Sequence, residues 1–353
     1  MTDTNFMVAY SEPILITGSN GFIGSRVVAT LLKYGYTNLR CFVRPSSNLT
    51  EIERIISSYK NAKIDIIKGN LLSRDVCVRI TEGVSLIYHL AAGRGEKSFP
   101  DAYMNSVVTT RNLLDSVLQI KNLKRFVNVS SFTVYSNNKI PRGGLLDELC
   151  ELERQPHLRG EAYCYAKVKQ DELLMEYGKK YDIPYVILRP GAVYGPGNKG
   201  ITGRVGTGTF GIFLHLGGSN IIPLSYVDNC ADAIVLAGLK KGIDGEIFNV
   251  VDDDLPTSRQ FLRMYKKNVG HFKSIYVPHA ISYFLCYLWE KYSQWSEGQL
   301  PPTYNRKVWA SGWKGNTYSN KKIKTLLGWH PRVGFEEAAK SYFEYQKSFG
   351  RIK

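Results

Sequence analysis

The first half of the chain alternates short apolar runs with segments in which apolar residues recur every three or four positions. The runs are rich in Ile, Val and Leu without strict polar alternation, as in strands buried on both faces. They span 13–18, 39–44, 63–69, 86–92, 125–131 and 185–190, and segments 24–35 and 104–119 have helical periodicity. This alternation predicts right-handed βαβ units, hence an α/β fold with a parallel, doubly wound sheet.

The pattern changes after Tyr194. The glycine-rich segment 195–211 predicts either a loop over a ligand cleft or a flexible linker. Residues 223–241 predict a short strand, a turn and a helix, and helices predominate from about residue 255.

Composition adds limits on class and location. The chain has 353 residues, 44% hydrophobic and 12% aromatic, as in ordinary folded proteins. The first twelve residues lack the features of a signal peptide, and no apolar run is long enough to span a bilayer. The six cysteines show no CxxC spacing and the six histidines are dispersed. We therefore expect a cytoplasmic protein with reduced thiols and no metal site.

The net charge of +15 is unevenly distributed, since residues 301–353 hold 11 Lys/Arg against 3 Asp/Glu, a net +8. Such a surface is either simply solvated or meets nucleic acid, anionic lipid or a phosphorylated ligand. No nucleic-acid-binding motif is present, so we expect no nucleic-acid partner. The aromatic stretch 279–295 could rest on a membrane surface, but a helix packed against the substrate pocket is the favoured interpretation.

A glycine-rich turn joins the first predicted strand to the first predicted helix. In ILITGSNGFIG, Gly18, Gly21 and Gly24 have GxxGxxG spacing. Glycines there allow a tight turn and a close approach of backbone to a pyrophosphate, which then lies on the positive end of the helix. The segment therefore predicts dinucleotide binding.

The end of the second predicted strand bears on which dinucleotide is bound. Arg44 stands twenty positions after Gly24, where an acidic residue would hold the ribose hydroxyls of NAD, and the next carboxylate is Glu51. Arg44 with Ser46 and Ser47 could hold a 2′-phosphate. We therefore favour NADP over NAD, the alternative being an exposed arginine at a strand end.

Two tyrosines precede a lysine in GEAYCYAKVKQDE, residues 160–172. On a helix, residues i and i+4 lie about 40° apart and residues i and i+2 about 200° apart. Tyr163 can thus share a face with Lys167, whereas Tyr165 points away. Alone, this pattern also fits an ordinary amphipathic helix.

Together these segments resemble the extended short-chain dehydrogenase/reductase superfamily, including the NAD-dependent epimerase/dehydratase family, over essentially the whole chain. The resemblance rests on TGSNGFIG, KGNLLS, YHLAA, the segment from Asn105, VSSFTVY, the YxxxK pair, RPGAVYGPG and YVDNCADAI. It implies a Rossmann dinucleotide-binding domain at 11–190 with about 225–250, and a smaller, mainly helical substrate-binding region at 191–224 and 251–353. A homodimer through helices 104–119 and 160–181 is also implied.

The resemblance also implies site residues. With the glycines and Arg44, the expected cofactor-binding residues are Gly18, Asn20, Gly21, Phe22, Ile23, Gly24, Arg44, Asn70, Leu71, Leu90, Ala91, Ala92, Asn105, Val129, Tyr163, Lys167, Pro190 and Val193. The expected catalytic residues are Ser131, Tyr163 and Lys167, with Thr133 assisting. Ser130, Cys164 and Tyr165 are interpreted as packing residues.

Residue chemistry indicates how these groups would act. A phenol has a pKa near ~10, and a neighbouring ammonium with a cationic nicotinamide would bring the pKa of Tyr163 toward neutrality. Tyr163 would then exchange a proton with a substrate oxygen while hydride moves to or from the cofactor. Lys167 would bond the nicotinamide ribose, and Ser131 the same substrate oxygen.

Three reactions compete. Dehydration is disfavoured because Val134 and Tyr135, rather than an acidic pair, follow Thr133. SSFTVY fits nucleotide-sugar epimerases, which retain NAD, but Arg44 departs from their pattern. FVRPSS, segment 203–229 and LLGWHP resemble 3β-hydroxysteroid dehydrogenase-like and dihydroflavonol reductase-like members. We therefore favour NADP-dependent alcohol/ketone interconversion, with epimerisation through a transient ketone as the alternative.

Two further questions stay open. Arg204 could meet a substrate phosphate or carboxylate, and Trp309 and Trp313 could stack on a substrate ring, although a plain loop arginine and core packing are the favoured interpretations. A non-enzymatic NADP-binding redox sensor is a different class of function. Intact Ser131, Tyr163 and Lys167 argue against it.

Overall fold

The computed structural model describes residues 6–93, 98–297 and 299–348. A seven-stranded sheet with strand order β12-β7-β5-β4-β1-β2-β3 forms its centre, and every neighbouring pair is parallel. Its strands are β1 (Ile14–Thr17), β2 (Asn38–Val43), β3 (Lys63–Lys68), β4 (Leu86–His89), β5 (Arg125–Val129), β7 (Tyr185–Pro190) and β12 (Ile247–Val250). The doubly wound α/β fold predicted from the sequence is confirmed.

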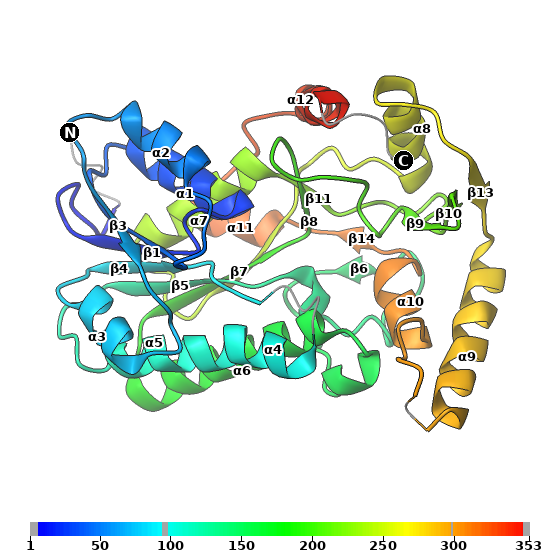
Figure 1. Ribbon diagram of the computed structural model, residues 1–353, viewed down its shortest axis with the longest axis horizontal. Coiled ribbons are helices and arrows are strands. Elements are labelled where there is room, and N and C mark those ends of the chain that lie inside the picture. Colours follow the sequence, from blue (N-terminus) through cyan, green and yellow to red (C-terminus); the bar gives the residue numbers. More distant parts are fainter. Residues whose placement is uncertain (1–5, 94–97, 298, 349–353) are drawn as a thin grey trace.

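Helices cover both faces of this sheet (Figure 1). On one face lie α1 (Phe22–Lys33), α2 (Thr50–Ser57), α7 (Val227–Leu239) and α11 (Lys321–Leu327), and on the other α3 (Arg74–Thr81), α4 (Phe99–Tyr103), α5 (Thr109–Val117) and α6 (Ala162–Tyr181). Successive strand residues supply the two layers: Ile14 and Ile16 join one apolar core and Leu15 the other. This is why the strands read as unbroken apolar runs.

The helix expected from residue 104 begins earlier and is not uniform. Ser98 caps α4 by accepting a hydrogen bond from the Asp101 N–H at 3.2 Å. The chain then passes through a π-helical turn, η1 (Met104–Val108), before α5 continues. Asn105, expected at the start of the helix, lies within this turn. Such turns often occur at functional sites.

The remaining strands form small sheets beside the main one. They are β6 (Leu145–Leu146) with β14 (Thr317–Tyr318), β8 (Ala192–Tyr194) with β11 (Leu224–Tyr226), and β10 (Ile212–His215) between β9 (Gly206–Thr209) and β13 (Ser274–Tyr276). The expected loop or linker at 195–211 is therefore wrong in part, because residues 206–209 pair with β10. Phe210 and Gly211, with φ of 46° and 74°, make the tight hairpin turn.

Helices predominate after residue 255, as predicted, with α8 (Ser258–Asn268), α9 (His279–Trp295), α10 (Arg306–Gly312) and α12 (Phe335–Ser348) beside α11. The end of α11 and Trp329 return to the main sheet. Trp329 is 1% exposed and its indole N–H bonds the Asn229 carbonyl of α7 at 3.2 Å. Ile323, Leu327 and Trp329 thereby complete the core that α1 and α7 share.

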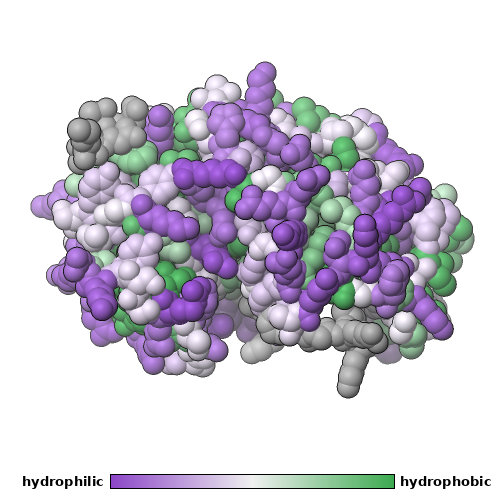
Figure 2. Space-filling model, turned by 90° about the horizontal axis from the view of Figure 1, so that it is seen from above, coloured by the Kyte–Doolittle hydropathy of each residue, from purple (hydrophilic) through white to green (hydrophobic). Residues whose placement is uncertain are grey.

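Helix α9 lies at one edge of the molecule (Figure 1) and packs on α10, where the Trp309 indole donates to the Ser282 hydroxyl at 2.9 Å. Its opposite side exposes an apolar stripe, defined as Ile281, Phe284, Leu285, Leu288, Tyr292 and Trp295. Among the described residues, no helix is long and apolar enough to cross a membrane. The face seen in Figure 2 is mostly hydrophilic.

Candidate active site

The turn between β1 and α1 requires glycine at two positions. Gly18 has φ of +70°, and a Cβ there would lie 2.9 Å from the Ala91 nitrogen. A Cβ on Gly24 would lie 2.1 Å from the Gly18 carbonyl oxygen. Gly21 is the N-cap of α1, and the described first turn of this helix holds no acidic side chain. The helix thus presents its positive end and free N–H groups, a fit for a pyrophosphate.

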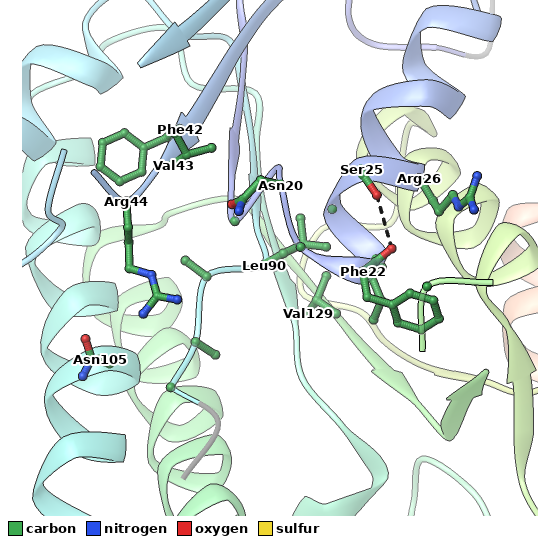
Figure 3. A pocket seen from close by; sticks show the side chains of 18 of the residues that line it. Asn20, Phe22, Ser25, Arg26, Phe42, Val43, Arg44, Leu90, Asn105 and Val129 are labelled. Atoms are coloured by element: carbon green, nitrogen blue, oxygen red, sulfur yellow. Dashed lines mark hydrogen bonds between the residues drawn. The ribbon is translucent and has the colours of Figure 1, made fainter. Parts of the chain in front are cut away.

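A cleft of about 830 Å³ opens at this turn. Sixteen of the eighteen expected cofactor-binding residues line it: Gly18, Asn20, Gly21, Phe22, Ile23, Gly24, Arg44, Asn70, Leu71, Leu90, Ala91, Ala92, Asn105, Val129, Tyr163 and Lys167. Figure 3 shows several of them, brought together from the ends of β1, β2, β4 and β5. The carboxyl ends of parallel strands are where ligands bind in folds of this kind.

Pro190 and Val193 are not among the residues that line the cleft. Pro190 ends β7, and Val193 lies in β8, where it pairs with Ser225 of β11. The same segment reaches the cleft slightly further on, at Pro196 and Gly197.

Other residues line the cleft that the sequence did not predict as cofactor-binding, among them Arg26, Glu51, Arg54, Ser130 and Tyr345. Arg26 lies two residues beyond Gly24 in α1, and its guanidinium donates to the Pro196 carbonyl at 3.4 Å. It lies within the helix predicted at 24–35, and its place one half-turn after Gly24 is the signal that could have found it. Tyr345, on the distant α12, leaves no comparable signal.

The side of the cleft at the end of β2 is basic. Arg44 is exposed, and its guanidinium extends toward the segment that carries Leu90 (Figure 3). Glu51 also lines the cleft but is paired with Arg54 at 2.8 Å, and this hydrogen bond lowers the pKa of Glu51. The carboxylate nearest in sequence to Arg44 is therefore already bound to another arginine.

Tyr163 lines the other end of the cleft, whereas the expected catalytic residues Ser131 and Thr133 are not among the residues that line it. Ser131 follows β5, and its hydroxyl accepts a hydrogen bond from the Thr133 N–H at 3.2 Å. Tyr163 lies in the first turn of α6, close to the Ser131 side chain. Burial of its hydroxyl raises the pKa of Tyr163, and the nearby Ser131 side chain offsets part of that rise, although the residue as a whole is 36% exposed.

Lys167 shares this end of the cleft but is buried, with 3% of its surface exposed. Its ammonium donates to the Val129 carbonyl at 2.7 Å and to Gln170 Oε1 at 2.9 Å. Burial lowers the pKa of Lys167 to about 8, against the raising effect of Asp171. The expected lowering of the Tyr163 pKa by this ammonium stays a prediction for the loaded site.

Neighbouring residues are placed as follows. Thr133 accepts hydrogen bonds on its carbonyl from Arg159 and from the buried Cys164 thiol. The Tyr165 ring packs against Phe99 with centroids 5.6 Å apart. Ser130, interpreted as a packing residue, is buried and lines the cleft.

Arg204, Trp309 and Trp313 lie beyond the cleft. Arg204 donates to the Ser311 carbonyl at 2.7 Å, and the Trp313 indole to the Gly203 carbonyl at 2.8 Å. With the Trp309–Ser282 bond, these contacts agree with the favoured interpretations, a plain loop arginine for Arg204 and core packing for Trp309 and Trp313. Val134 and Tyr135 are fully buried, so neither position offers an acid or base for dehydration.

The sheet, the glycine turn and the Ser–Tyr–Lys constellation define the extended short-chain dehydrogenase/reductase class. Within that class, residues 14–250 match the profile of the NAD dependent epimerase/dehydratase family, and the chain belongs to this family. The relatives that it matches include a dehydrogenase and enzymes with dehydratase and epimerase activities. The family predicted from the sequence is confirmed.

Two relatives illustrate the range of the family. A sterol-4-alpha-carboxylate 3-dehydrogenase (decarboxylating) of Candida albicans is 26% identical over 349 residues, 92% of this chain and 95% of that one. A trifunctional UDP-glucose 4,6-dehydratase/3,5-epimerase/reductase of Arabidopsis thaliana is 28% identical over 262 residues. That match covers 71% of this chain, which spans only 38% of the plant enzyme.

Among solved structures, UDP-glucuronic acid 4-epimerase of Bacillus cereus, in complex with UDP-glucuronic acid and NAD, superposes with a TM-score of 0.71. It is 22% identical, and the alignment covers 96% of this chain and 99% of that one. This likeness shows a common fold.

Proposed function

We propose that the protein interconverts a secondary alcohol and a ketone by hydride transfer with a nicotinamide dinucleotide. The observation that carries the proposal is the placement of Tyr163, beside Ser131, and of Lys167 at one end of a cleft whose other end is the glycine turn. The cleft thereby joins a place for a pyrophosphate to a place for proton exchange with a substrate oxygen.

The side chains divide the chemistry between them. Ser131 and Tyr163 hold the substrate oxygen, and Tyr163 donates a proton to it in reduction or accepts one in oxidation. When bound, the dinucleotide supplies or takes up the hydride. Lys167, with its pKa lowered to about 8 by burial, is largely protonated at neutral pH, so its charge favours the phenolate of Tyr163.

The full-length similarity to a sterol-carboxylate 3-dehydrogenase supports oxidoreduction, since that relative aligns over 92% of this chain. The substrate is a small molecule bound beside Tyr163.

The test compares two tyrosines on the same helix. Tyr163→Phe should reduce kcat by about a hundredfold to ten-thousandfold, the usual loss when a general acid or base is removed. Tyr165→Phe keeps the ring that packs on Phe99 and should retain activity. Turnover is followed by the absorbance of the reduced nicotinamide with a panel of ketones and secondary alcohols. Equal activity of both variants would refute the assignment of Tyr163.

We further propose that NADP is the preferred cofactor, because Arg44 lines the cleft at the end of β2 and Glu51 is paired with Arg54. Arg44→Ala should raise the Kd for NADPH by about tenfold to a hundredfold, the value of a charged hydrogen bond. The Kd for NADH should change little. Arg79→Ala, exposed on α3 and outside the cleft, is the control. Equal weakening of both nucleotides by Arg44→Ala would favour NAD.

A second candidate is epimerisation of a nucleotide sugar through a transient ketone. It is favoured by the shared fold with an epimerase that binds UDP-glucuronic acid and NAD. The same Tyr163 would serve, but the cofactor would be regenerated in each cycle. Tightly co-purifying NAD and UDP-sugar interconversion without net reduction would establish this reaction in place of the first.

The homodimer through segments 104–119 and 160–181 stays a prediction.

A further inference from the structure

A continuous chain of buried hydrogen bonds links Lys167 to the glycine turn. Lys167 donates to Gln170 Oε1, and Gln170 Nε2 donates to the Thr110 hydroxyl at 2.7 Å. The Thr110 hydroxyl lies 2.8 Å from His89 Nε2, and His89 Nδ1 lies 2.8 Å from the hydroxyl of Thr17. All five side chains are 3% exposed or less. We call Gln170, Thr110, His89 and Thr17 the relay.

The proton positions in the relay follow from counting donors. A threonine hydroxyl has one hydrogen, and that of Thr110 is directed at the Ser106 carbonyl, 2.6 Å away. Thr110 Oγ1 must therefore accept from both Gln170 Nε2 and His89 Nε2. His89 thus carries its proton on Nε2, which leaves Nδ1 to accept from Thr17.

The hydrogen bonds of the Thr17 hydroxyl agree with this tautomer of His89. Its oxygen accepts a hydrogen bond from the Ala91 N–H at 3.3 Å, so its single hydrogen is free to point at His89 Nδ1. A doubly protonated imidazole would place two hydrogens between His89 Nδ1 and Thr17. Burial and the nearby charge of Lys167 lower the pKa of His89 to about 3, which agrees with a neutral ring.

The relay ends beside a position of the cleft where only glycine fits. Thr17 directly precedes Gly18, which has no room for a Cβ against Ala91. Ser106 lies in the π-helical turn beside Asn105, and its hydroxyl accepts from the Gly93 N–H at 2.9 Å. The relay thus joins four cleft-lining segments, from β1, β4, η1 with α5, and α6.

We propose that His89, fixed as its neutral Nε2-protonated tautomer, is the central positioning residue of a relay that holds the ammonium of Lys167 and the glycine turn in register for cofactor binding. None of the relay residues exchanges a proton with substrate in this account. The effect on turnover rests on the proposed function, whereas the tautomer and the effect on nucleotide binding do not.

The first test reads the tautomer directly. In the ¹⁵N-labelled full chain, two-bond ¹H–¹⁵N correlations of the imidazole, assigned by loss in His89→Gln, should show a protonated Nε2 and an unprotonated Nδ1. The shifts should stay constant from about pH 8 to about pH 5. A protonated Nδ1, or a titration midpoint inside that range, would overturn the proposal.

The second test removes the junction of the relay. Thr110→Val keeps the shape but loses the hydroxyl, and should raise the Kd for NADPH or NADH, whichever binds more tightly, by about tenfold to a hundredfold, as displaced binding groups do. Thr81→Val is the control, because Thr81 is equally buried and donates to the carbonyl four residues earlier, in α3.

Thr110→Ser restores the hydroxyl and should restore binding, which separates the role of the bond from a general loss of folding. If Thr110→Val does not fold, the comparison is made with Thr17→Val, which loses the hydroxyl beside His89 Nδ1, and with its conservative partner Thr17→Ser, which keeps that hydroxyl. Binding by Thr110→Val at the wild-type Kd would overturn the proposal, whether or not a substrate has been found. Wild-type protein that binds nucleotide but turns over no alcohol or ketone would count against the proposed function alone.

Discussion

Burial sets the charge states of the residues around the cleft. Lys167 and His89 are both bases, and removal from water lowers the pKa of each, to about 8 and about 3. The lysine therefore keeps its charge near neutrality while the imidazole stays neutral. One positive charge beside the phenol of Tyr163 is thus preserved, and a second is avoided.

The difference between the pKa of His89 in the native state and in the unfolded state makes the free energy of unfolding depend on pH. An unfolded histidine takes up a proton below a pKa of about 6.5, which native His89 cannot do until about pH 3. Between these values the unfolded state binds more protons, so stability falls as pH falls, by about 1.4 kcal/mol per pH unit for this residue. Above about pH 6.5 the term is constant.

His89→Gln should therefore show a shallower loss of unfolding free energy from about pH 6.5 to about pH 5, whatever its stability at neutral pH. His215, whose pKa burial lowers to about 4, leaves part of the slope in place. His157→Gln, at an exposed site, is the control. Urea unfolding at several pH values measures the slopes, and an unchanged slope in His89→Gln would contradict a neutral His89.

At the residue scale, the sequence predicted those site residues whose function depends on their spacing along the chain. Gly18, Gly24, Tyr163 and Lys167 can be located because a local turn or a single helix sets their geometry. The partners of Lys167 could not be found in this way. Its bond to Val129 joins residues 38 positions apart, and only the tertiary fold brings them together.

At the element scale, the contact between α7 and β4 depends on a glycine outside the cofactor site. The Tyr88 hydroxyl of β4 donates to the Val235 carbonyl of α7 at 2.8 Å. A Cβ on Gly238 would lie 2.2 Å from the Tyr88 oxygen, and Tyr88 is fully buried.

Gly238→Ala should therefore destabilise the protein by about 1–3 kcal/mol, the usual cost of overpacking, despite the better helix propensity of alanine. Gly270→Ala is the control, because a Cβ there meets no atom within 4 Å. Thermal unfolding compares the two variants. A Gly238→Ala protein as stable as the wild type would mean that α7 can shift on the sheet.

The elements themselves were predictable to different degrees. Six strands of the main sheet follow from their apolar runs, since burial on both faces leaves a pattern in the residues. The π-helical turn at Met104–Val108 leaves none, because its side chains are compatible with an ordinary helix and only packing selects the wider turn. The β9–β10 hairpin was missed because glycine also marks loops.

At the scale of the whole molecule, the stripe on α9 contrasts with the buried side of that helix. Leu216, Cys286 and Trp313 form a small core beneath α9, whereas Phe284 and Leu288 are 55% and 46% exposed. Exposed side chains contribute little to folding, because they are solvated in both states.

The double variant Phe284→Ser, Leu288→Ser should keep the unfolding free energy of the wild type within about 0.5 kcal/mol per site. Trp313→Ala should lower it by about 3–5 kcal/mol. Urea unfolding at low protein concentration provides both values. A large loss in the double variant would show that the stripe is covered in solution.

The return of Trp329 to the first core has a consequence for biosynthesis. The helices and strands that build the sheet leave the ribosome long before residues 323–329, which fill the space beside α1 and α7. Until that segment emerges, the nascent chain holds a nearly finished sheet with an open apolar gap, the kind of surface that chaperones bind. Residues 323–329 thus cover this gap late, and the core of the cofactor-binding half is complete only after that segment has been synthesised.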